Sequence, residues 1–473
     1  MSPRSSVLTS RCASQGLALA CAIVLTGGCV RFQPRPITPE ATAEQWAARS
    51  LRDEGLHQFM QRTLTGRVPA WPVATWDADD LTLAAIYYQP GLAVARAQWE
   101  VAQAGTRTAA ERPNPSVSAS ATYDTTTPPP WIPAVSFDVP IETAGKRGYR
   151  MAQAEALAAA ARWDLIQKIW DTRAAVRSAL VGVYNARESA RLLQRQENAQ
   201  AEVVRLLEGQ LKAGAVAQAD VTPARIARDT TRLALEQARQ QETEARAGLA
   251  DAIGIPASAL DHTALSFAGL DRFPAPQRVP EMRREAVLHR ADIRSALASY
   301  AASQSALQLE LANQYPDIHL GPGYEFDQTD NKWTLGITLP LPIMNQDRGP
   351  IAEAEARRKL SAAQFVAVQA RALGEIDVAL AGYRSALAQS RTAAELLDQL
   401  QRRLNSARAM QQAGEVDPLA VASADVEYAT SAAQHLDALI KAQQALGRLE
   451  AAVQSPQVIP DTLVQQVESV PSP

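Results

Sequence analysis

The segment KAGAVAQADVTPAR, Lys212 to Arg225, is a glycine-containing turn set into a long helical pattern. A second segment of the same design, QAGEVDPLAVASA, runs from Gln412 to Ala424. Its Gly414 lies 414 − 214 = 200 positions after Gly214. Self-similarity at a fixed spacing indicates a duplicated unit. We therefore expect the chain to contain two copies of one structural unit.

The same spacing recurs well away from the two turns. Pro140 and Pro340 are 200 positions apart, and Pro115 and Pro316 are 201 apart. The segments around these prolines have the same pattern of strands and helices in both places. Each copy is therefore predicted to be a helix, two strands, a long helix, the turn and a returning helix.

The helices of each copy are unusually long. Gly148 to Gly214 contains no proline, and these 66 residues would form a rod of roughly 100 Å. Pro350 to Gly414 repeats this length, and returning helices are expected from Pro223 to about Ile253 and from Pro418 to about Val453. Hydrophobic residues make up 47% of the chain but aromatic ones only 5%, because alanine dominates. Small side chains suit closely packed helices, so the fold class is mainly α, of the coiled-coil or helical-barrel kind.

Between the helices lie segments in which apolar and polar residues alternate. They are Ser116 to Asp124, Trp131 to Val139, Ile318 to Phe326 and Trp333 to Leu339. Strands that are apolar on one face and polar on the other, with aromatic residues near their ends, are typical of outer-membrane β-barrels. A hairpin on a soluble core would show the same alternation. The charged or polar residues expected to face a lumen are Asp138, His319 and Glu325.

Four strands are too few to close a barrel, and an open sheet edge cannot lie in lipid, because its backbone groups would lack hydrogen-bond partners. With about four strands from each chain, two chains would supply 2 × 4 = 8 strands and a barrel whose interior is filled by side chains. Three chains would supply about 3 × 4 = 12 strands and leave a lumen. Because a pore needs a lumen, we expect a homotrimer, with a membrane β-barrel of about 12 strands on a long periplasmic α-helical barrel.

The beginning of the chain has the pattern of a bacterial export signal. A basic region is followed by the apolar run Ala13 to Leu25 and then by Thr26-Gly27-Gly28-Cys29. Small residues before a cysteine resemble a lipobox, which predicts a lipoprotein-type signal peptide and acylation of Cys29. An ordinary signal peptide or a buried thiol is the alternative. Val30 is not the aspartate that favours retention at the inner membrane, which indicates a lipid anchor in the outer one.

The expected domain organisation follows from these segments. It comprises a signal peptide at 1–28, an extended N-terminal arm at 29–80 with a short helix near Ala41 to Thr63, a first repeat at 81–270, a second repeat at 271–453 and a C-terminal tail at 454–473. The other cysteines, Cys12 and Cys21, fall within the expected signal peptide. The mature chain should therefore have neither a disulfide framework nor a thiolate metal site.

Composition and motifs argue against an enzyme. The five histidines show no metal-ligand spacing, and no Walker loop, H-E-x-x-H or G-x-S-x-G stretch is present. Carboxylate pairs such as Glu353 and Glu355 lie within a charged helix and are expected to be solvated. The net charge of −3, with basic and acidic residues interspersed, gives no reason to expect nucleic-acid binding. We expect no cofactor.

The duplicated layout and the turn pattern G-x-V-x-x-x-D-V-x-x-A-R resemble the TolC family of outer-membrane efflux proteins. The residues carrying the pattern are Gly214, Val216, Asp220, Val221, Ala224 and Arg225. The stretches VPIETAGKRG and LPLPIMNQDRG are similar to those of the heavy-metal, CzcC-like branch. The resemblance implies a passive exit duct in the outer membrane of a Gram-negative bacterium, docked to a periplasmic adaptor and an inner-membrane pump of the resistance-nodulation-division class.

The resemblance also assigns roles to residues near the turns. It implies an adaptor-docking tip formed by Gly214, Ala215, Val216, Gly414, Glu415 and Val416, and a periplasmic gate with Asp220 and Asp417. Simpler roles are also open, because glycine commonly ends helices. Asp417 before Pro418 has the pattern of a helix N-cap. Ala420 and Ser423 stand where TolC itself has aspartates, so the gate's ion preference stays open.

Other functions remain as alternatives. A periplasmic adaptor has a signal and a helical hairpin but lacks a duplication spanning the chain, and a structural coiled-coil lipoprotein would lack the four strands. Within the exit-duct class, the duct could export heavy-metal cations, drugs and other organic compounds, or proteins by type I secretion. Only two short stretches of sequence favour heavy-metal cations.

Overall fold

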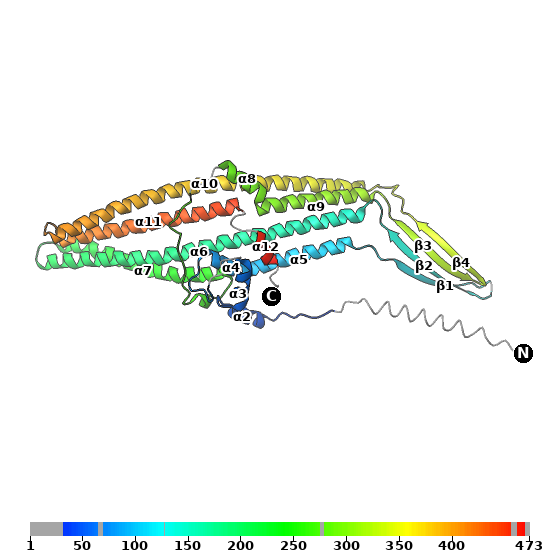
Figure 1. The fold of residues 1–473 in the computed structure, drawn as a ribbon, viewed down its shortest axis with the longest axis horizontal. Helices are drawn as coiled ribbons and strands as arrows, with labels where there is room; N and C mark the ends of the chain where they lie inside the picture. The colour runs from blue at the N-terminus through cyan, green and yellow to red at the C-terminus, as the bar shows by residue number, and fades with distance from the viewer. Residues whose placement is uncertain (1–31, 65–69, 127, 275–278, 456–460, 469–473) are drawn as a thin grey trace. The chain divides into compact units, whose positions relative to one another are not determined.

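The computed structural model describes residues 32–64, 70–126, 128–274, 279–455 and 461–468 (Figure 1). The chain divides into two compact units, residues 1–48 and 49–473. The described part of the first unit contains helix α2 (Pro39–Ala47), which begins with a proline that cannot donate a backbone hydrogen bond. The rest of the fold concerns the second unit.

The second unit contains the predicted duplication. The elements of the first copy are α5 (Pro90–Ala110), β1 (Ser116–Tyr123), β2 (Trp131–Ile141), α6 (Lys146–Lys212) and α7 (Gln218–Ile253). Those of the second copy are α9 (Ala291–Asn313), β3 (Ile318–Asp327), β4 (Asp330–Thr338), α10 (Arg348–Gln412) and α11 (Pro418–Val453). The predicted order of helix, two strands, long helix, turn and returning helix is therefore confirmed in both copies.

Each long helix has two shorter helices running along it. Figure 1 shows α7 and α5 in line beside α6, and α11 and α9 in line beside α10. Helix α6 also packs against α9 and α11, so it joins the two copies, whereas α10 packs against α8 (Val279–His289), α9 and α11. At 67 residues, α6 is a rod of about 100 Å. Alanines at the contacts allow the axes to approach closely.

The four strands form one antiparallel sheet in the order β1-β2-β3-β4 at one end of the helices (Figure 1). The register pairs Ala119 with Val135, Val135 with Tyr324, and Tyr324 with Trp333. Apolar residues therefore line up on one face of the sheet, as the alternation predicted. Within the described residues, β1 and β4 each pair on one side only.

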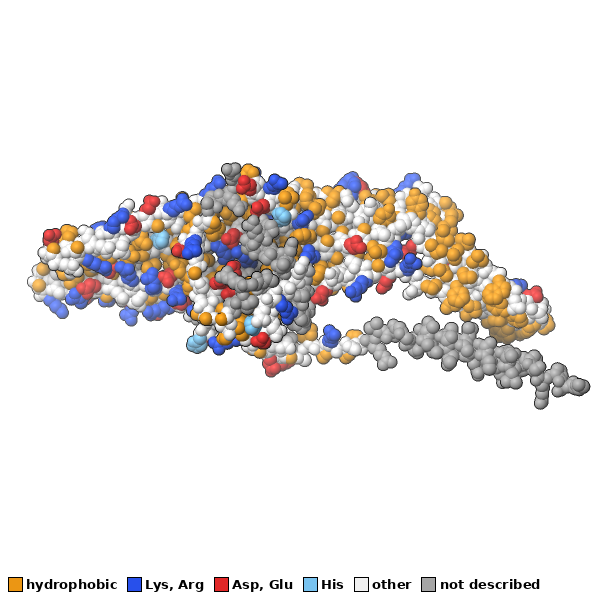
Figure 2. Space-filling model, in the orientation of Figure 1, with side chains coloured by type: hydrophobic (Ala, Val, Ile, Leu, Met, Phe, Trp, Pro, Cys, Tyr) orange, Lys and Arg blue, Asp and Glu red, His pale blue; other side chains and the backbone are white. Residues whose placement is uncertain are grey.

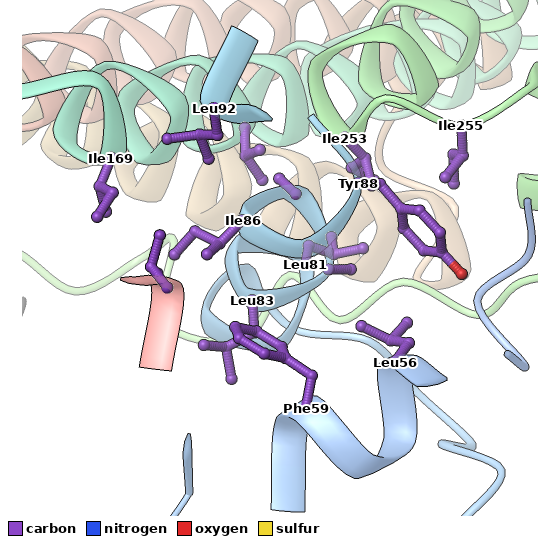
Figure 3. Packing of buried hydrophobic residues seen from close by; sticks show 14 of the residues in the cluster. Leu56, Phe59, Leu81, Leu83, Ile86, Tyr88, Leu92, Ile169, Ile253 and Ile255 are labelled. Atoms are coloured by element: carbon purple, nitrogen blue, oxygen red, sulfur yellow. The ribbon is translucent and has the colours of Figure 1, made fainter. Parts of the chain in front are cut away.

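The largest hydrophobic core lies where short helices cover the middle of the long ones. Helices α3 (Glu54–Thr63) and α4 (Ala78–Tyr88) and the 3₁₀ turn η1 (Ala257–Leu260) contribute to it. Figure 3 shows side chains of α3, α4, α6 and α7 meeting in this cluster. Its fully buried members include Leu56, Leu81, Ile86, Leu92, Leu165, Ile169, Leu249 and Ile253. Burial of such large side chains, at roughly 1.5–3 kcal/mol each, fastens the first copy together.

The segment between α7 and α8 links the two copies and contacts both of them. Near its start, Leu265 forms a parallel β-bridge with Trp76 of the N-terminal arm, and Phe267 packs on Tyr184 of α6, with ring centroids 5.3 Å apart. Farther along, the Gln443 side chain donates a hydrogen bond to the Leu270 carbonyl (2.5 Å), and the Tyr383 hydroxyl donates to the Pro274 carbonyl (2.6 Å). The link therefore crosses from first-copy helices to α10 and α11 and helps to hold them side by side.

Several segments differ from the sequence-based expectation. The arm at 29–80 is not extended throughout: in place of one helix near 41–63 it holds α2 and α3, and Phe59 of α3 is buried. Helix α7 begins at Gln218 rather than Pro223, because the Asp220 carboxylate caps its first turn and the proline ring is exposed. The tail at 454–473 contains α12 (Asp461–Glu468), whose Val467 is fully buried in the core.

Candidate functional site

The first turn is closed by backbone hydrogen bonds. The Gly214 N–H donates to the Leu211 carbonyl (3.0 Å), and the Ala215 N–H donates to the Gln210 carbonyl (2.8 Å). This pair of bonds is a Schellman motif, which requires a left-handed residue after the helix. Gly214 has φ +73°, so the absence of a side chain is what allows the turn.

The second turn repeats this arrangement atom for atom. The Gly414 N–H donates to the Gln411 carbonyl (3.0 Å), the Glu415 N–H donates to the Met410 carbonyl (2.9 Å), and Gly414 has φ +76°. The helix-ending role considered for both glycines is therefore confirmed. A Cβ at either glycine would meet nothing within 4 Å, so surrounding atoms do not exclude a side chain there.

The two turns lie next to each other at the end of the helices away from the sheet (Figure 1). The Gln210 side chain donates to the Asp417 carboxylate across them (3.2 Å). Gly214, Ala215, Gly414 and Glu415 are exposed, and Val216 and Val416 are half-buried. The six residues of the predicted docking tip thus form one exposed surface with two small apolar patches.

The two aspartates of the predicted gate each stabilise the start of a helix. Asp220 accepts a hydrogen bond from the Ala217 N–H (2.9 Å). Asp417 accepts one from the Leu419 N–H (2.9 Å), with Pro418 as the first residue of α11. The N-cap predicted for Asp417 is confirmed. Both residues are exposed, so the lone pairs of their carboxylates that these hydrogen bonds do not use are open to solvent.

The polar face of the sheet consists mainly of small residues. It is made of Ser116, Ser118, Ser120, Ser136, Gly321, Gly323, Thr334, Gly336 and Thr338. Charged residues stand only at its two ends. This face offers hydroxyl groups and backbone amides to solutes and presents few bulky side chains.

Two of the predicted lumen residues contact each other at the helix-side end of this face. His319 Nδ1 lies 3.0 Å from both carboxylate oxygens of Asp138. His319 is on β3 and Asp138 on β2, and both side chains are partly exposed. If Nδ1 carries the proton, Nε2 is left as an acceptor on the polar face.

Glu325 lies on the same face at the other end of β3. It sits opposite Lys332 of β4, whose ammonium is 3.9 Å from Glu325 and 2.5 Å from Asp327. Lys332 was missed from the sequence because the predicted strand began at Trp333. Its spacing of two positions from Thr334 is the sequence signal that would have placed it on the polar face.

The stretch VPIETAGKRG joins the sheet to α6 through Asp317, just before β3. Lys146 Nζ donates to the Asp317 carboxylate (2.8 Å), as does the Thr143 N–H (3.0 Å). Burial raises the pKa of Asp317, but these hydrogen bonds outweigh it and the net pKa lies below the ordinary value. The motif therefore works as a junction between the copies.

The opposite face of the sheet is apolar and exposed. Figure 2 shows hydrophobic side chains gathered over the strands. Leu335 is 72% exposed and Trp333 is 80% exposed, values unusual for such side chains in water. Near the hairpin ends Tyr123 packs on Trp131 and Tyr324 packs on Trp333, each pair with ring centroids 4.9 Å apart.

Some expectations fall outside what the structure describes, and some groups are absent from what it does describe. Cys29 and the signal peptide at 1–28 lie outside the described residues. In the described ranges we find no set of three or more His, Cys, Asp or Glu side chains placed to hold a metal ion. Among the described helices, none has the length and hydropathy that a membrane crossing requires.

Solved structures share this fold. A membrane protein from Pseudomonas aeruginosa matches with a TM-score of 0.66 and 19% identity, over 83% of this chain and 99% of that one. The outer membrane protein VceC from Vibrio cholerae matches with a TM-score of 0.66 and 20% identity, over 80% of this chain and 96% of that one.

A curated relative matches part of the chain. The cobalt-zinc-cadmium resistance protein CzcC of Cupriavidus metallidurans is 26% identical over 220 residues, which are 46% of this chain and 52% of the relative. The chain thus spans about half the length of that protein in the match.

The family model for outer membrane efflux proteins matches residues 84–255 and again residues 282–453. The two matches correspond to the two copies of the duplicated unit and together cover most of the chain. The chain therefore belongs to the outer membrane efflux protein family, the family of TolC.

Proposed function

We propose that this protein is the outer-membrane channel of a tripartite efflux system, a passive exit duct without catalytic residues. The observation that carries the proposal is the four-stranded sheet, apolar on one face and polar on the other, with both edges unpaired in the described chain. Such a sheet becomes stable in lipid only when other chains complete a barrel.

Three copies would give 3 × 4 = 12 strands from the four-stranded sheet, enough for a barrel with a lumen. The exposed face with Trp333 and Leu335 would contact lipid, and the serine- and glycine-rich face would line the pore. Outer-membrane fractions should contain a trimer that dissociates on heating, as seen by gel electrophoresis with and without boiling. A protein that is a stable monomer in mild detergent would contradict the proposal.

The exposed turns are proposed to dock a periplasmic adaptor, which links the duct to an inner-membrane pump of the resistance-nodulation-division class. The support is their position at the end of the helices away from the sheet and their small, exposed residues. Gly214, Ala215 and Val216 would form the contact in one copy, and Gly414, Glu415 and Val416 in the other. Site-specific photo-cross-linking from Ala215 and Glu415 in cells should capture one partner of adaptor size.

The exposed oxygens of Asp220 and Asp417 are proposed to lie near the closed aperture, where three chains bring acidic groups together. The support is that both carboxylates lie at the starts of helices that begin at the tip. Asp417→Asn keeps a capping side chain but removes the charge. It should reduce block of single-channel current by multivalent cations, and unchanged block would exclude Asp417 from the aperture.

Heavy-metal cations are the proposed cargo. The support is the match to a cobalt-zinc-cadmium resistance protein and the two stretches VPIETAGKRG and LPLPIMNQDRG. A deletion strain should be sensitive to zinc, cobalt, cadmium, nickel or copper and unaffected by dyes and antibiotics. Sensitivity confined to organic compounds would keep the duct and replace the metal cargo with drugs.

Cys29 is proposed to carry the lipid anchor in the outer membrane. The support is the Leu-Thr-Gly-Gly-Cys stretch after an apolar run. Wild-type protein should incorporate labelled palmitate, and Cys29→Ser should not. Equal labelling of both would move the acylation elsewhere.

A further inference from the structure

The two copies within one chain meet through a specific helix pair. Arg195 of α6, in the first copy, donates to the Asp425 carboxylate of α11, in the second copy (2.8 Å). The same guanidinium lies 4.3 Å from the ring centroid of Tyr428. The long helix of one copy thus recognises the returning helix of the next copy by charge.

Among the described residues, the second copy has no such neighbour within the chain. Helix α10 is the counterpart of α6, and in the described residues it packs along α8, α9 and α11, all from its own copy. Its other side is open. The sheet has the same asymmetry, because β2 pairs with β3 of the next copy whereas β4 has a free edge.

The correspondence between the copies is accurate enough to map the contact. Helices α6 and α10 end at Lys212 and Gln412, and α7 and α11 both run for 36 residues, from Gln218 and Pro418. The offset is therefore 200 at the tip end of the long helices and along the returning helices, although α6 and α10 begin 348 − 146 = 202 positions apart, and neither returning helix contains an insertion. Adding or subtracting it converts Arg195 into Glu395 and Asp425 into Arg225.

The charges at the mapped positions are complementary but reversed. In place of an arginine on the long helix and an aspartate on the returning helix, there is a glutamate on α10 and an arginine on α7. The position of Tyr428 maps to Arg228, which adds a second positive charge on α7. Glu395 is exposed, and in the described part of the chain it makes no ion pair.

The same offset converts a second contact between the copies into a pair of positions on α10 and at the start of α7. Gln210 donates to Asp417 within the chain, and the corresponding residues are Met410 and Ala217. A polar pair is replaced by two uncharged side chains, and Met410 is 40% exposed. Neither position would bury an unpaired charge if α10 met the α7 helix of another copy.

We infer that the open side of α10 binds the α7 helix of a second copy of this chain, with Glu395 of one subunit paired to Arg225 of the next. This inference rests on the proposed trimer and adds the residues that select the neighbour. The reversed sign has a consequence for specificity. Glu395 matches Arg225 of α7 but would face Asp425 if the surface met α11, so like charges disfavour the wrong pairing.

Charge reversal tests the pair directly. Glu395→Arg places like charges at the interface and should lower the temperature at which the trimer dissociates on gels, as should Arg225→Glu. The combined swap should recover most of that loss. Arg225 also contacts Glu208 in its own chain (2.5 Å), so recovery in the swap, rather than the single effects, carries the conclusion. Glu353→Arg is the matched control, because Glu353 is an exposed residue of the same helix that pairs with Arg357, lies many turns from Glu395, and should leave the trimer unchanged.

Cross-linking tests the geometry independently. Glu395→Cys combined with Arg225→Cys should give covalent inter-chain species with a short bismaleimide, and neither single variant should. An intact trimer with neither cross-links nor recovery in the swap would overturn the inference and leave the proposed trimer standing. Charge reversals that leave the trimer intact but release an adaptor would also overturn it. Absence of any trimer in the wild type would overturn the proposed function itself.

Discussion

Gln89 and Arg290, 201 positions apart, make the same contact in the two copies. Each precedes the short helix beside the sheet and donates from its side chain to a carbonyl near the end of the returning helix. Gln89 reaches the Ala252 carbonyl (3.1 Å) and Arg290 reaches the Ala452 carbonyl (2.7 Å). These residues hold α7 to α5 and α11 to α9, so that each pair acts as one rod alongside its long helix.

The Arg290 contact should matter more than the Gln89 contact. The Arg290 side chain is 5% exposed and also bonds Asp292 and Glu375. Burial lowers the pKa of Arg290, but the two carboxylates outweigh it and raise the pKa, so the guanidinium stays charged. Arg290→Ala would remove the close partner of Asp292 and leave it only the longer contact with Arg371 (4.0 Å), so it should cost about 3 kcal/mol of unfolding free energy.

Gln89→Ala removes a neutral hydrogen bond and should cost about 1 kcal/mol. Urea unfolding followed by tryptophan fluorescence compares the two variants. Arg290→Lys, which keeps the charge without the fork of donors, should fall between Arg290→Ala and wild type. Equal losses for Arg290→Ala and Gln89→Ala would show that the buried ion pairs add nothing.

The junction at Asp317 should give an acid-dependent contribution to stability. Because the folded-state pKa of Asp317 is depressed, the contribution is present above the ordinary value of 3.8 and is lost as pH falls through the lower folded value. At neutral pH Asp317→Asn should lose about 1–2 kcal/mol. Well below pH 3.8 the variant and wild type should unfold at the same urea concentration. A constant difference at all pH values would refute the assignment.

Substitutions at the two tip glycines can separate the effect of the backbone conformation from the effect of the exposed surface. Replacing Gly214 and Gly414 with asparagine keeps a residue that tolerates positive φ, whereas phenylalanine costs roughly 1–2 kcal/mol of strain at each site and adds bulk to the exposed surface. We expect the double phenylalanine variant to assemble as a trimer but lose resistance, and the double asparagine variant to retain most of it. Normal resistance in the phenylalanine variant would remove the docking assignment.

Neighbouring residues of β4 test which face meets lipid. Leu335→Arg puts a charge on the apolar face, which in a membrane barrel costs about 2–4 kcal/mol near the midplane. Thr334→Arg puts the same charge on the polar face. The yield of heat-sensitive trimer should fall for Leu335→Arg and hold for Thr334→Arg. The reverse result would exchange lipid and lumen faces.

Much of the fold could be predicted from the sequence because its signals are local. The glycine turns, the start of α11 at Pro418 and the alternation within each strand depend on residues within a few positions of one another. Because the unit is duplicated, each local signal occurs twice in the sequence, and a boundary predicted in one copy can be compared with the corresponding boundary in the other. Asp138, His319 and Glu325 could be placed together on the polar face of the sheet for this reason, since strand periodicity alone decides which residues share a face.

Tertiary structure decided which surfaces meet. Alanine-rich helices have weak periodicity, and nothing near Arg195 indicates that Asp425, 230 positions away, will be its partner. The burial of Val467 in the largest hydrophobic core, and the hydrogen bond that Arg96 donates to its carbonyl, depend likewise on the whole helical framework. The sequence by itself determined the repeated unit, its turns and its strand faces, because backbone geometry and side-chain periodicity act over short distances. Only the assembled fold decided the partners across helices, because those contacts depend on how long rods align.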